Sequence, residues 1–216
     1  MILNENILIY DDIIPLEKQN TIQQYFEENY KNFIYHKKSI SLGETEVSEE
    51  YLFPGWSINV DKNFNLNKEI FDIVKEIEEI TIKKSNFKML KNYRYKFNCF
   101  EPLSKEPPLV ELYKNIHRDH DIEHLVLLYY VNDSDGDTLL FKNKLGNDIK
   151  SNNEVENQIK TGEISNLELI HTITPKKGRI AVFDGNMLHC AGWPTKGKRF
   201  NINYNVVIQT QNKLLI

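Results

Sequence analysis

The sequence is poor in cysteine and has no long apolar run, and both shortages exclude classes of protein. Cys99 and Cys190 are the 2 cysteines among 216 residues, too few for a disulfide framework, which indicates a reducing compartment. No apolar stretch approaches the roughly 18 residues that a membrane-spanning helix requires. The first residues carry neither the basic nor the apolar region of a signal peptide. We therefore expect a cytoplasmic protein with no membrane partner.

The chain also lacks an excess of charge of one sign. Its 27 lysines and arginines stand against 31 aspartates and glutamates, which gives a net charge of -4. This balance argues against a general nucleic-acid-binding protein, because such proteins carry a strongly basic face. With 40% hydrophobic residues, 11 tyrosines and 11 phenylalanines, the sequence is too apolar for a disordered chain. Its length fits a single domain over residues 1–216.

Two helices are predicted in the N-terminal part of the chain. Asp11, Asp12 and Pro15 favour a helix start, so we expect a helix over residues 16–30. Between residues 67 and 84, apolar side chains recur at spacings of three and four among Lys and Glu. That spacing predicts a second, amphipathic helix that buries one face.

After residue 84 the pattern changes to that of β-strands. Residues 89–100 alternate with a period close to two, and later β-type runs are separated by turns rich in Asn, Asp, Gly and Pro. Two helices followed by many strands predict a mostly-β α+β fold with a sandwich or jelly-roll body. We expect helical support over about 1–88, a barrel over about 89–210 and a polar insertion at about 142–166. The shorter β-type runs lie at 7–10, 125–131, 138–141, 167–174, 179–183 and 199–209.

The residues that can carry chemistry begin with a cluster of histidines and acids at 117–124. On an extended strand, His117 and Asp119 point to the same face, so an imidazole nitrogen and a carboxylate oxygen could hold one metal ion. A distant histidine would complete a set of two histidines and one carboxylate, the ligand set of non-haem iron(II) oxygenases. His189 follows a β-type run 72 residues after His117, and Arg199 lies 10 residues further on.

This ordered combination resembles the Fe(II)/2-oxoglutarate-dependent dioxygenases, in particular their prolyl 4-hydroxylase-like branch. The surrounding strands match as well, because Leu-Leu-Tyr-Tyr-Val-Asn at 127–132 is followed by Gly-Asp-Thr-Leu-Leu-Phe at 136–141. The resemblance covers roughly residues 93–209. It implies a double-stranded β-helix, a jelly-roll or cupin-like barrel, supported here by the two N-terminal helices.

The resemblance also implies a metal centre and a set of reactants. His117, Asp119 and His189 would be the catalytic iron ligands. Fe(2+) and the co-substrate 2-oxoglutarate would act with O2, and ascorbate is an accessory reductant that the resemblance admits. The implied reaction hydroxylates a C–H bond of a protein side chain, as in prolyl hydroxylation, while 2-oxoglutarate and O2 become succinate and CO2. A free amino acid or other small molecule is the alternative substrate, and the sequence predicts no oligomeric state.

Four further residues are candidates for binding the co-substrate. In the family, a basic residue at the position of Arg199 pairs with the distal carboxylate of 2-oxoglutarate, a role that suits a guanidinium fork. Asn201 points the same way as Arg199 on a strand and could assist it. The second polar partner that the family uses is not clearly matched, and Tyr129 and Thr138 are our candidates for it.

Two other interpretations remain open. His117, His120 and His124 could bind zinc in a hydrolase, since His120 and His124 are four residues apart, as in a helical zinc pair. A non-catalytic jelly-roll module, binding or structural, would keep the barrel without iron. Nucleic-acid demethylation is disfavoured, because Asn205 stands where AlkB-like enzymes have a second arginine.

Overall fold

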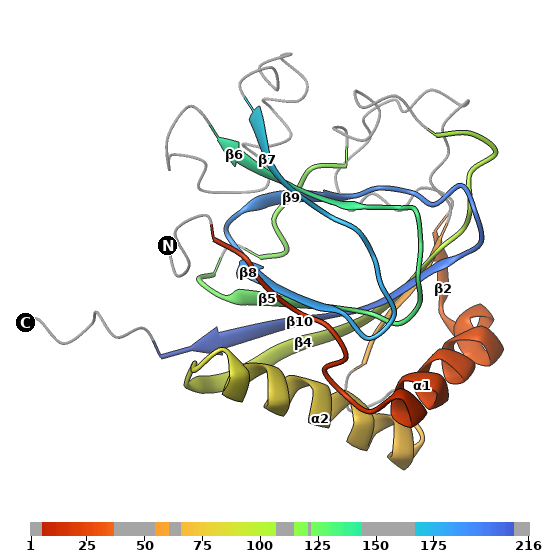
Figure 1. The fold of residues 1–216 in the computed structure, drawn as a ribbon, viewed down its shortest axis with the longest axis horizontal. Helices are drawn as coiled ribbons and strands as arrows, with labels where there is room; N and C mark the ends of the chain where they lie inside the picture. Colours follow the sequence, from red (N-terminus) through yellow and green to blue (C-terminus); the bar gives the residue numbers. More distant parts are fainter. Residues whose placement is uncertain are drawn as a thin grey trace, which may run out of the picture.

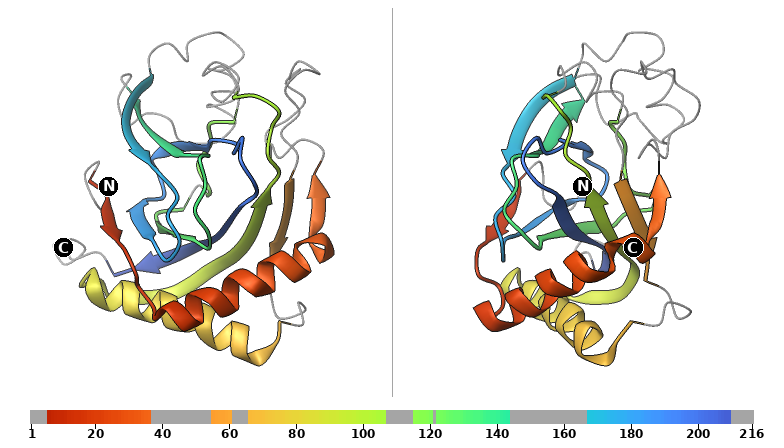
Figure 2. Two further views of the ribbon diagram at one scale, coloured as in Figure 1. Left: turned by 45° about the vertical axis from the view of Figure 1, so that its right-hand side comes forward. Right: turned by 90° about the vertical axis from the view of Figure 1, so that its right-hand side faces the viewer.

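Two antiparallel β-sheets face each other, and two helices cover the outer face of the larger sheet (Figure 1). The computed structural model describes residues 6–36, 55–60, 66–106, 115–120, 122–143 and 167–209. Viewed from the side, the smaller sheet lies above the larger one and both helices lie beneath it (Figure 2). This is the predicted mostly-β α+β fold, a double-stranded β-helix with two supporting N-terminal helices.

The larger sheet has seven strands and the smaller sheet has three. In the larger sheet the order is β1-β8-β5-β10-β4-β3-β2, and in the smaller one it is β7-β6-β9. Every pairing between these strands is antiparallel. The strands are β1 (Leu8–Tyr10), β2 (Ile34–His36), β3 (Gly55–Asn59), β4 (Met89–Phe100), β5 (Leu125–Tyr130), β6 (Thr138–Asn143), β7 (Leu167–Ile173), β8 (Ile180–Asp184), β9 (Leu188–Ala191) and β10 (Arg199–Ile208).

Both predicted helices are present, and their apolar faces explain where they lie. Helix α1 (Leu16–Asn29) is followed by a short 3-10 turn, and α2 (Lys68–Lys84) begins where the Asn67 side chain accepts the Ile70 N–H at 3.2 Å. The apolar stripe of α2 is buried against the large sheet, as the three-and-four spacing predicts. Neither of these described helices is long and apolar enough to cross a membrane.

The strand β5 divides its side chains between two separate clusters of buried residues. Its odd-numbered residues, such as Leu127 and Tyr129, pack with the helices beneath the large sheet. Its even-numbered residues, such as Leu128 and Tyr130, face the space between the two sheets. All six residues of β5 are buried, as expected of a strand that is covered on both faces.

Some elements were not predicted. The short strands β2, β3 and β9 were missed, because three to five residues are too few to establish a period of two. The predicted polar insertion at 142–166 lies outside the described residues, apart from the last two residues of β6.

An ion pair holds the segment after β1 against the turn before β8. Arg179 donates to both carboxylate oxygens of Asp11, at 2.7 and 3.0 Å, and Lys176 donates at 3.0 Å. The hydrogen bond from Arg179 lowers the pKa of Asp11 from 3.8 to about 2. The stability that this pair provides is therefore complete above pH 3.8 and is lost as the pH falls through about 2.

We expect Asp11→Asn to lower the free energy of unfolding by about 1 kcal/mol at neutral pH, since the pair is partly exposed to solvent. Urea unfolding of both proteins between pH 2 and pH 7 measures this difference. The gap should close as the pH falls through the pKa of about 2. A gap that stays constant over the whole range would contradict the assignment.

Candidate metal centre

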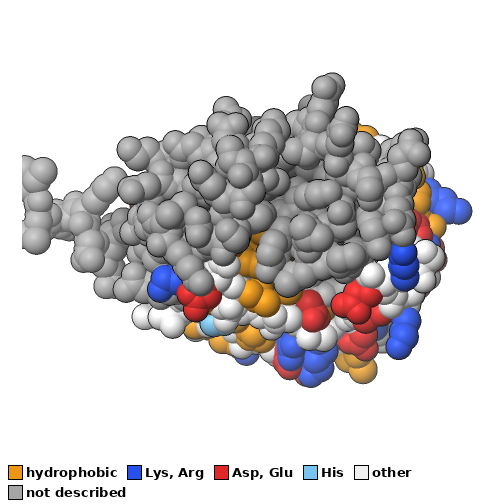
Figure 3. Space-filling view, turned by 90° about the horizontal axis from the view of Figure 1, so that it is seen from above, with side chains coloured by type: hydrophobic (Ala, Val, Ile, Leu, Met, Phe, Trp, Pro, Cys, Tyr) orange, Lys and Arg blue, Asp and Glu red, His pale blue; other side chains and the backbone are white. Residues whose placement is uncertain are grey.

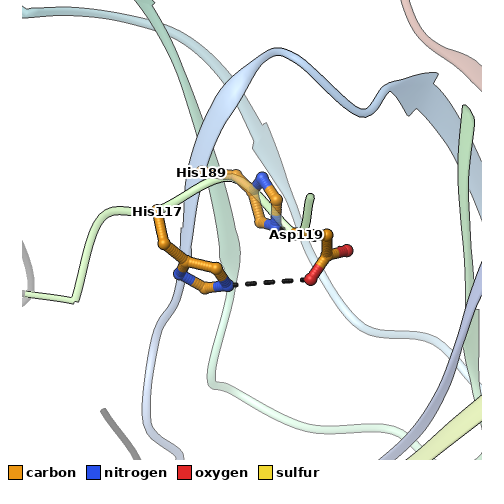
Figure 4. A group of neighbouring side chains, drawn as sticks. All are labelled: His117, Asp119 and His189. Atoms are coloured by element: carbon orange, nitrogen blue, oxygen red, sulfur yellow. Dashed lines mark ion pairs between the residues drawn. The ribbon is translucent and has the colours of Figure 1, made fainter. Parts of the chain in front are cut away.

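His117, Asp119 and His189 come together from two distant parts of the chain (Figure 4). His117 and Asp119 lie in the segment between β4 and β5, and His189 lies on β9 of the smaller sheet. We expected the first two on an extended strand, but in the described part of this segment His117 makes an isolated β-bridge with His189 and belongs to no strand. In that bridge the His117 N–H donates to the His189 carbonyl at 2.9 Å, and the His189 N–H returns a bond at 3.0 Å. The bridge sets the two imidazole rings side by side, with centroids 4.7 Å apart.

The donor atoms of the three side chains surround a common point. Nε2 of His117 lies 3.9 Å from Oδ1 of Asp119, and Nε2 of His189 lies 3.9 Å from Oδ2. These separations are too long for hydrogen bonds. Two ligands that each lie about 2.1 Å from one ion can be at most about 4.2 Å apart, so each pair taken singly is within reach of one ion. One donor atom from each of the three residues lies within 4.8 Å of the other two. Two imidazoles and a carboxylate fit a divalent transition metal, and iron(II) is the ion that this set suits.

Backbone carbonyls fix which nitrogen of each histidine is available to a metal. Nδ1 of His117 lies 2.8 Å from the Asn115 carbonyl oxygen, and Nδ1 of His189 lies 3.0 Å from that of Met187. Because a carbonyl oxygen only accepts, each Nδ1 must carry the proton. In the neutral form of each ring, Nε2 is then the nitrogen with a lone pair, and it lies on the side of Asp119 before any metal arrives.

The protonation states of the cluster also suit a cation. Burial lowers the pKa of His117 to about 4, and the neighbouring His189 acts in the same direction. Burial alone would raise the pKa of Asp119, but His189, Arg94 and His117 outweigh it and hold that pKa well below 3.8. At neutral pH the site therefore offers an uncharged His117 and an ionised carboxylate, so a metal need not displace a proton from either.

Three side chains of the large sheet hold the Asp119 carboxylate in place. Arg94 on β4 donates to Oδ1 at 2.9 Å, while Asn203 and Asn205 on β10 donate to Oδ2 at 2.8 and 3.0 Å. Arg94 also donates to the side-chain oxygen of Asn205 at 2.7 Å, which links two of the three. Asp119 thus lies on an irregular segment, and its orientation is set by the sheet beneath it.

The cluster lies in a cavity between the two sheets, and Arg199 lines the same cavity. The cavity has a volume of about 160 Å³. Typical pockets for drug-sized ligands measure roughly 300–1,000 Å³, so this space suits a small molecule. Its lining combines the metal cluster and other polar side chains with apolar ones such as Phe183 and Trp193.

Arg199 is a buried cation without a counter-ion in the described part of the chain. Its side chain is 1% exposed, and it donates to the Gly192 carbonyl at 2.9 Å and to the Thr138 hydroxyl at 2.7 Å. Its Nε has no hydrogen-bond partner among the described residues, and no carboxylate of those residues lies within 4 Å of the guanidinium. A buried charge without a partner is costly, so the group is arranged for an anion that enters the cavity.

The other predicted co-substrate residues divide between the two faces of their strands. Thr138 and Asn201 line the cavity with Arg199. Tyr129 does not, because the alternation of β5 turns its ring toward the helices, where it packs in the apolar cluster. The neighbouring Tyr130 lies on the cavity side of β5, and its hydroxyl is 2.7 Å from that of Thr138. The sequence could not tell which tyrosine faces the cavity, because β5 is apolar on both faces.

The histidines of the alternative zinc site do not form a group of three metal ligands in the described part of the chain, although the rings of His120 and His124 lie 6.4 Å apart. Among the described residues, His117, Asp119 and His189 are the group that could hold a metal ion. His124 is fully buried, and a Cβ atom at Gly185 would lie 2.2 Å from its Nε2, so it is packed against backbone. His120 instead makes an edge contact with the ring of Tyr93, with centroids 4.5 Å apart.

We expect Asn205→Ala to weaken metal binding about 10- to 100-fold, because Asp119 loses one donor directly and Arg94 loses its anchor. Anaerobic titration with Fe(II) and titration with Zn(II) measure the affinity. Asn201→Ala is the matched control, since Asn201 lies on the same face of β10 but bonds to Asn98 instead of Asp119. Equal losses in the two variants would show that the network does not position the ligand.

No protein-family model and no curated protein matches the sequence. Solved structures do match in fold. A prolyl-4-hydroxylase from Pseudomonas putida matches with a TM-score of 0.54 and 10% identity, over 95% of this chain and 94% of that one. A Trichoplax adhaerens prolyl hydroxylase, in complex with a peptide of hypoxia inducible factor, matches with a TM-score of 0.59, 14% identity and coverages of 94% and 84%. SnoK, a non-haem α-ketoglutarate-dependent carbocyclase from nogalamycin biosynthesis, matches with a TM-score of 0.59 and 13% identity, over 94% of this chain and 79% of that one. The chain therefore shares its fold with prolyl hydroxylases and with other α-ketoglutarate-dependent enzymes.

Proposed function

We propose that the protein is an Fe(II)/2-oxoglutarate-dependent dioxygenase that hydroxylates a C–H bond and converts 2-oxoglutarate and O2 to succinate and CO2. One observation carries the proposal. A set of two histidines and one carboxylate lies in the same small cavity as a buried arginine that has no carboxylate partner among the described residues. A metal ion suits the three ligands, and a small anionic molecule suits the arginine.

His117, Asp119 and His189 would hold the iron. Three protein ligands leave coordination positions free for the co-substrate and O2. When bound, iron(II) together with the keto acid supplies the oxidising power for the reaction. The protein contributes the geometry, because the Nδ1 bonds of both histidines and the three donors to Asp119 hold the ligands in place before binding.

Arg199 would pair with the distal carboxylate of 2-oxoglutarate through its guanidinium fork. The Thr138 hydroxyl lines the cavity beside it and accepts a hydrogen bond from Arg199. When the Tyr130 hydroxyl donates to Thr138, the proton of Thr138 is available for the same carboxylate. Burial raises the pKa of Tyr130, so its hydroxyl keeps its proton and remains a donor at neutral pH. Asn201 lines the cavity next to them, held by a hydrogen bond from Asn98 at 2.9 Å.

A protein side chain, such as a prolyl residue, is the substrate we propose, and a free amino acid or other small molecule is the alternative. The prolyl hydroxylases among the similar structures support the first, and the α-ketoglutarate-dependent enzyme of nogalamycin biosynthesis supports the second.

The same proposal includes three further points. These are ascorbate as an accessory reductant, a cytoplasmic location and a single domain over residues 1–216. From above, the described side chains along one edge of the view are basic, acidic and hydrophobic (Figure 3).

The central experiment is an anaerobic titration of the protein with Fe(II) and 2-oxoglutarate. We expect a weak visible charge-transfer band from the complex, followed by release of succinate when air is admitted. His189→Ala should abolish the band, because it removes one of the three ligands and leaves the backbone bridge in place. Absence of the band, together with unchanged metal content in His189→Ala, would refute the proposal.

A second experiment separates the co-substrate site from the metal site. Arg199→Met should weaken 2-oxoglutarate binding about 100-fold or more while metal affinity changes by less than about threefold, because a buried carboxylate loses its ion pair. Arg199→Lys keeps the charge without the fork and should recover part of the loss. Arg179→Met is the control for loss of an arginine whose side chain does not line the cavity and pairs with Asp11 instead. Parallel loss of metal and 2-oxoglutarate in Arg199→Met would point to misfolding instead.

A further inference from the structure

The large sheet contributes a wall of polar side chains to the cavity. In one cross-strand row, Ser57 on β3, Asn98 on β4 and Asn201 on β10 lie next to one another. In the following row, Lys96 on β4 lies beside Asn203 on β10. All five residues line the cavity. An apolar substrate would desolvate these polar groups without giving them hydrogen-bond partners, which costs free energy. The wall therefore favours a polar substrate.

Lys96 is the charged member of this wall. Within the described part of the chain, its ammonium group makes no hydrogen bond and has no carboxylate within 4 Å. Burial lowers the pKa of Lys96, and the neighbouring charge of Arg94 lowers it further, while Asp119 acts in the opposite direction. The Asp119 carboxylate already accepts hydrogen bonds from Arg94, at 2.9 Å, and from two asparagines.

The charges around the cavity remain unbalanced after the proposed cofactors are added. Of the described side chains that line the cavity, Lys96 and Arg199 are cations and Asp119 is the carboxylate, which Arg94 pairs with from outside the lining at 2.9 Å. The charge of Asp137 acts on Arg199, which leaves Lys96 as the cation with the least compensation. Iron(II) and the doubly charged 2-oxoglutarate would neutralise each other, so they leave this positive excess unchanged. Arg199 is taken up by the distal carboxylate of 2-oxoglutarate in the proposed function. Lys96 is therefore the cation that is left for a third ligand.

We propose that the substrate carries a carboxylate and that Lys96 binds it, a specificity that rests on the proposed function. With Arg199 engaged by 2-oxoglutarate, Lys96 offers a single positive charge, which matches the one charge of a carboxylate better than the nearly double charge of a phosphate. The contact holds the acid group against the β4 side of the cavity and so orients the substrate relative to the metal ligands. The acid can belong to a free small molecule or to an acidic residue of a peptide.

The test observes Lys96 directly in protein loaded with Zn(II) and 2-oxoglutarate, which fills the metal site and pairs Arg199 without turnover. Acetate and acetamide are the probes, because they differ in charge but hardly in size. With lysines labelled at Cε, we expect acetate to shift the Lys96 resonance in a saturable way and acetamide to leave it unchanged. Equal responses to the two probes, or none to acetate, would overturn the proposal.

Two variants give the matched comparison. Lys96→Met keeps the length of the side chain without its charge, and should reduce acetate affinity about tenfold while 2-oxoglutarate affinity stays within about threefold of the wild-type value. Lys91→Met, at an exposed position of the same strand, should change neither. If Lys96→Met weakens 2-oxoglutarate as strongly as Arg199→Met does, Lys96 belongs to the co-substrate site and the proposal is wrong.

The source of the acid is resolved by two sets of probes. One set contains free L-amino acids with their carboxamides, and the other contains blocked tripeptides with a central Asp or Asn. Stronger binding of the free acids indicates a small-molecule substrate, and stronger binding of the Asp peptide indicates an acidic peptide. No preference for acid over amide in either set rejects the carboxylate. Succinate release on admission of air to the Fe(II) form tests the proposed function separately, so the two failures cannot be confused.

Discussion

The arrangement of the site depends on two backbone hydrogen bonds between His117 and His189. They attach an otherwise irregular segment to β9, and by doing so they place two imidazoles from opposite ends of the barrel sequence next to each other. Asp119 is carried by the same segment, so its approach to both rings follows from the same bridge. The ligand geometry is therefore a consequence of how one loop is attached to the smaller sheet, while the carboxylate is aimed by the larger one.

The strand β10 supplies two of the three side chains that orient the Asp119 carboxylate. Its odd-numbered residues from Arg199 to Asn205 face the interior, where they reach the cavity or the Asp119 carboxylate. Its even-numbered residues, such as Ile202 and Tyr204, pack against the helices in the apolar cluster. One strand thus anchors the helical layer with one face and builds the wall of the site with the other. Helices α1 and α2 therefore contribute to the site indirectly, because they pack against β10, the strand that positions the ligands.

The metal set was predictable because its signal is ordered spacing rather than local pattern. A His-x-Asp motif, a distal His189 and Arg199 ten residues later form a combination that chance seldom assembles. The helices were predictable because α2 repeats its apolar spacing over more than four turns. Both signals persist over enough residues to outweigh local ambiguity.

Other residues were hidden for physical reasons. Tyr129 and Tyr130 could not be distinguished, because β5 is buried on both faces and alternation disappears from its sequence. Arg94 and Lys96 read as exposed positions of a half-polar strand, although both turn toward the site. Their roles depend on which strand lies beside β4, and cross-strand register is a property of the whole sheet.

The charge arrangement would let the cavity bind the two proposed anions in distinct places. Asp119 accepts hydrogen bonds from Arg94 at Oδ1 and from two asparagines at Oδ2, so it is held in place and keeps one acceptor position on Oδ1 for a metal ion. Arg199 lies in the row of Phe100 on β4, two positions beyond the row of Asn98, and Lys96 lies in the row on the other side of Asn98. Along β4, the two cationic positions are therefore separated by a neutral amide row. A dicarboxylate bound at Arg199 and an acid bound at Lys96 could then approach the metal ligands from different directions without occupying the same part of the wall.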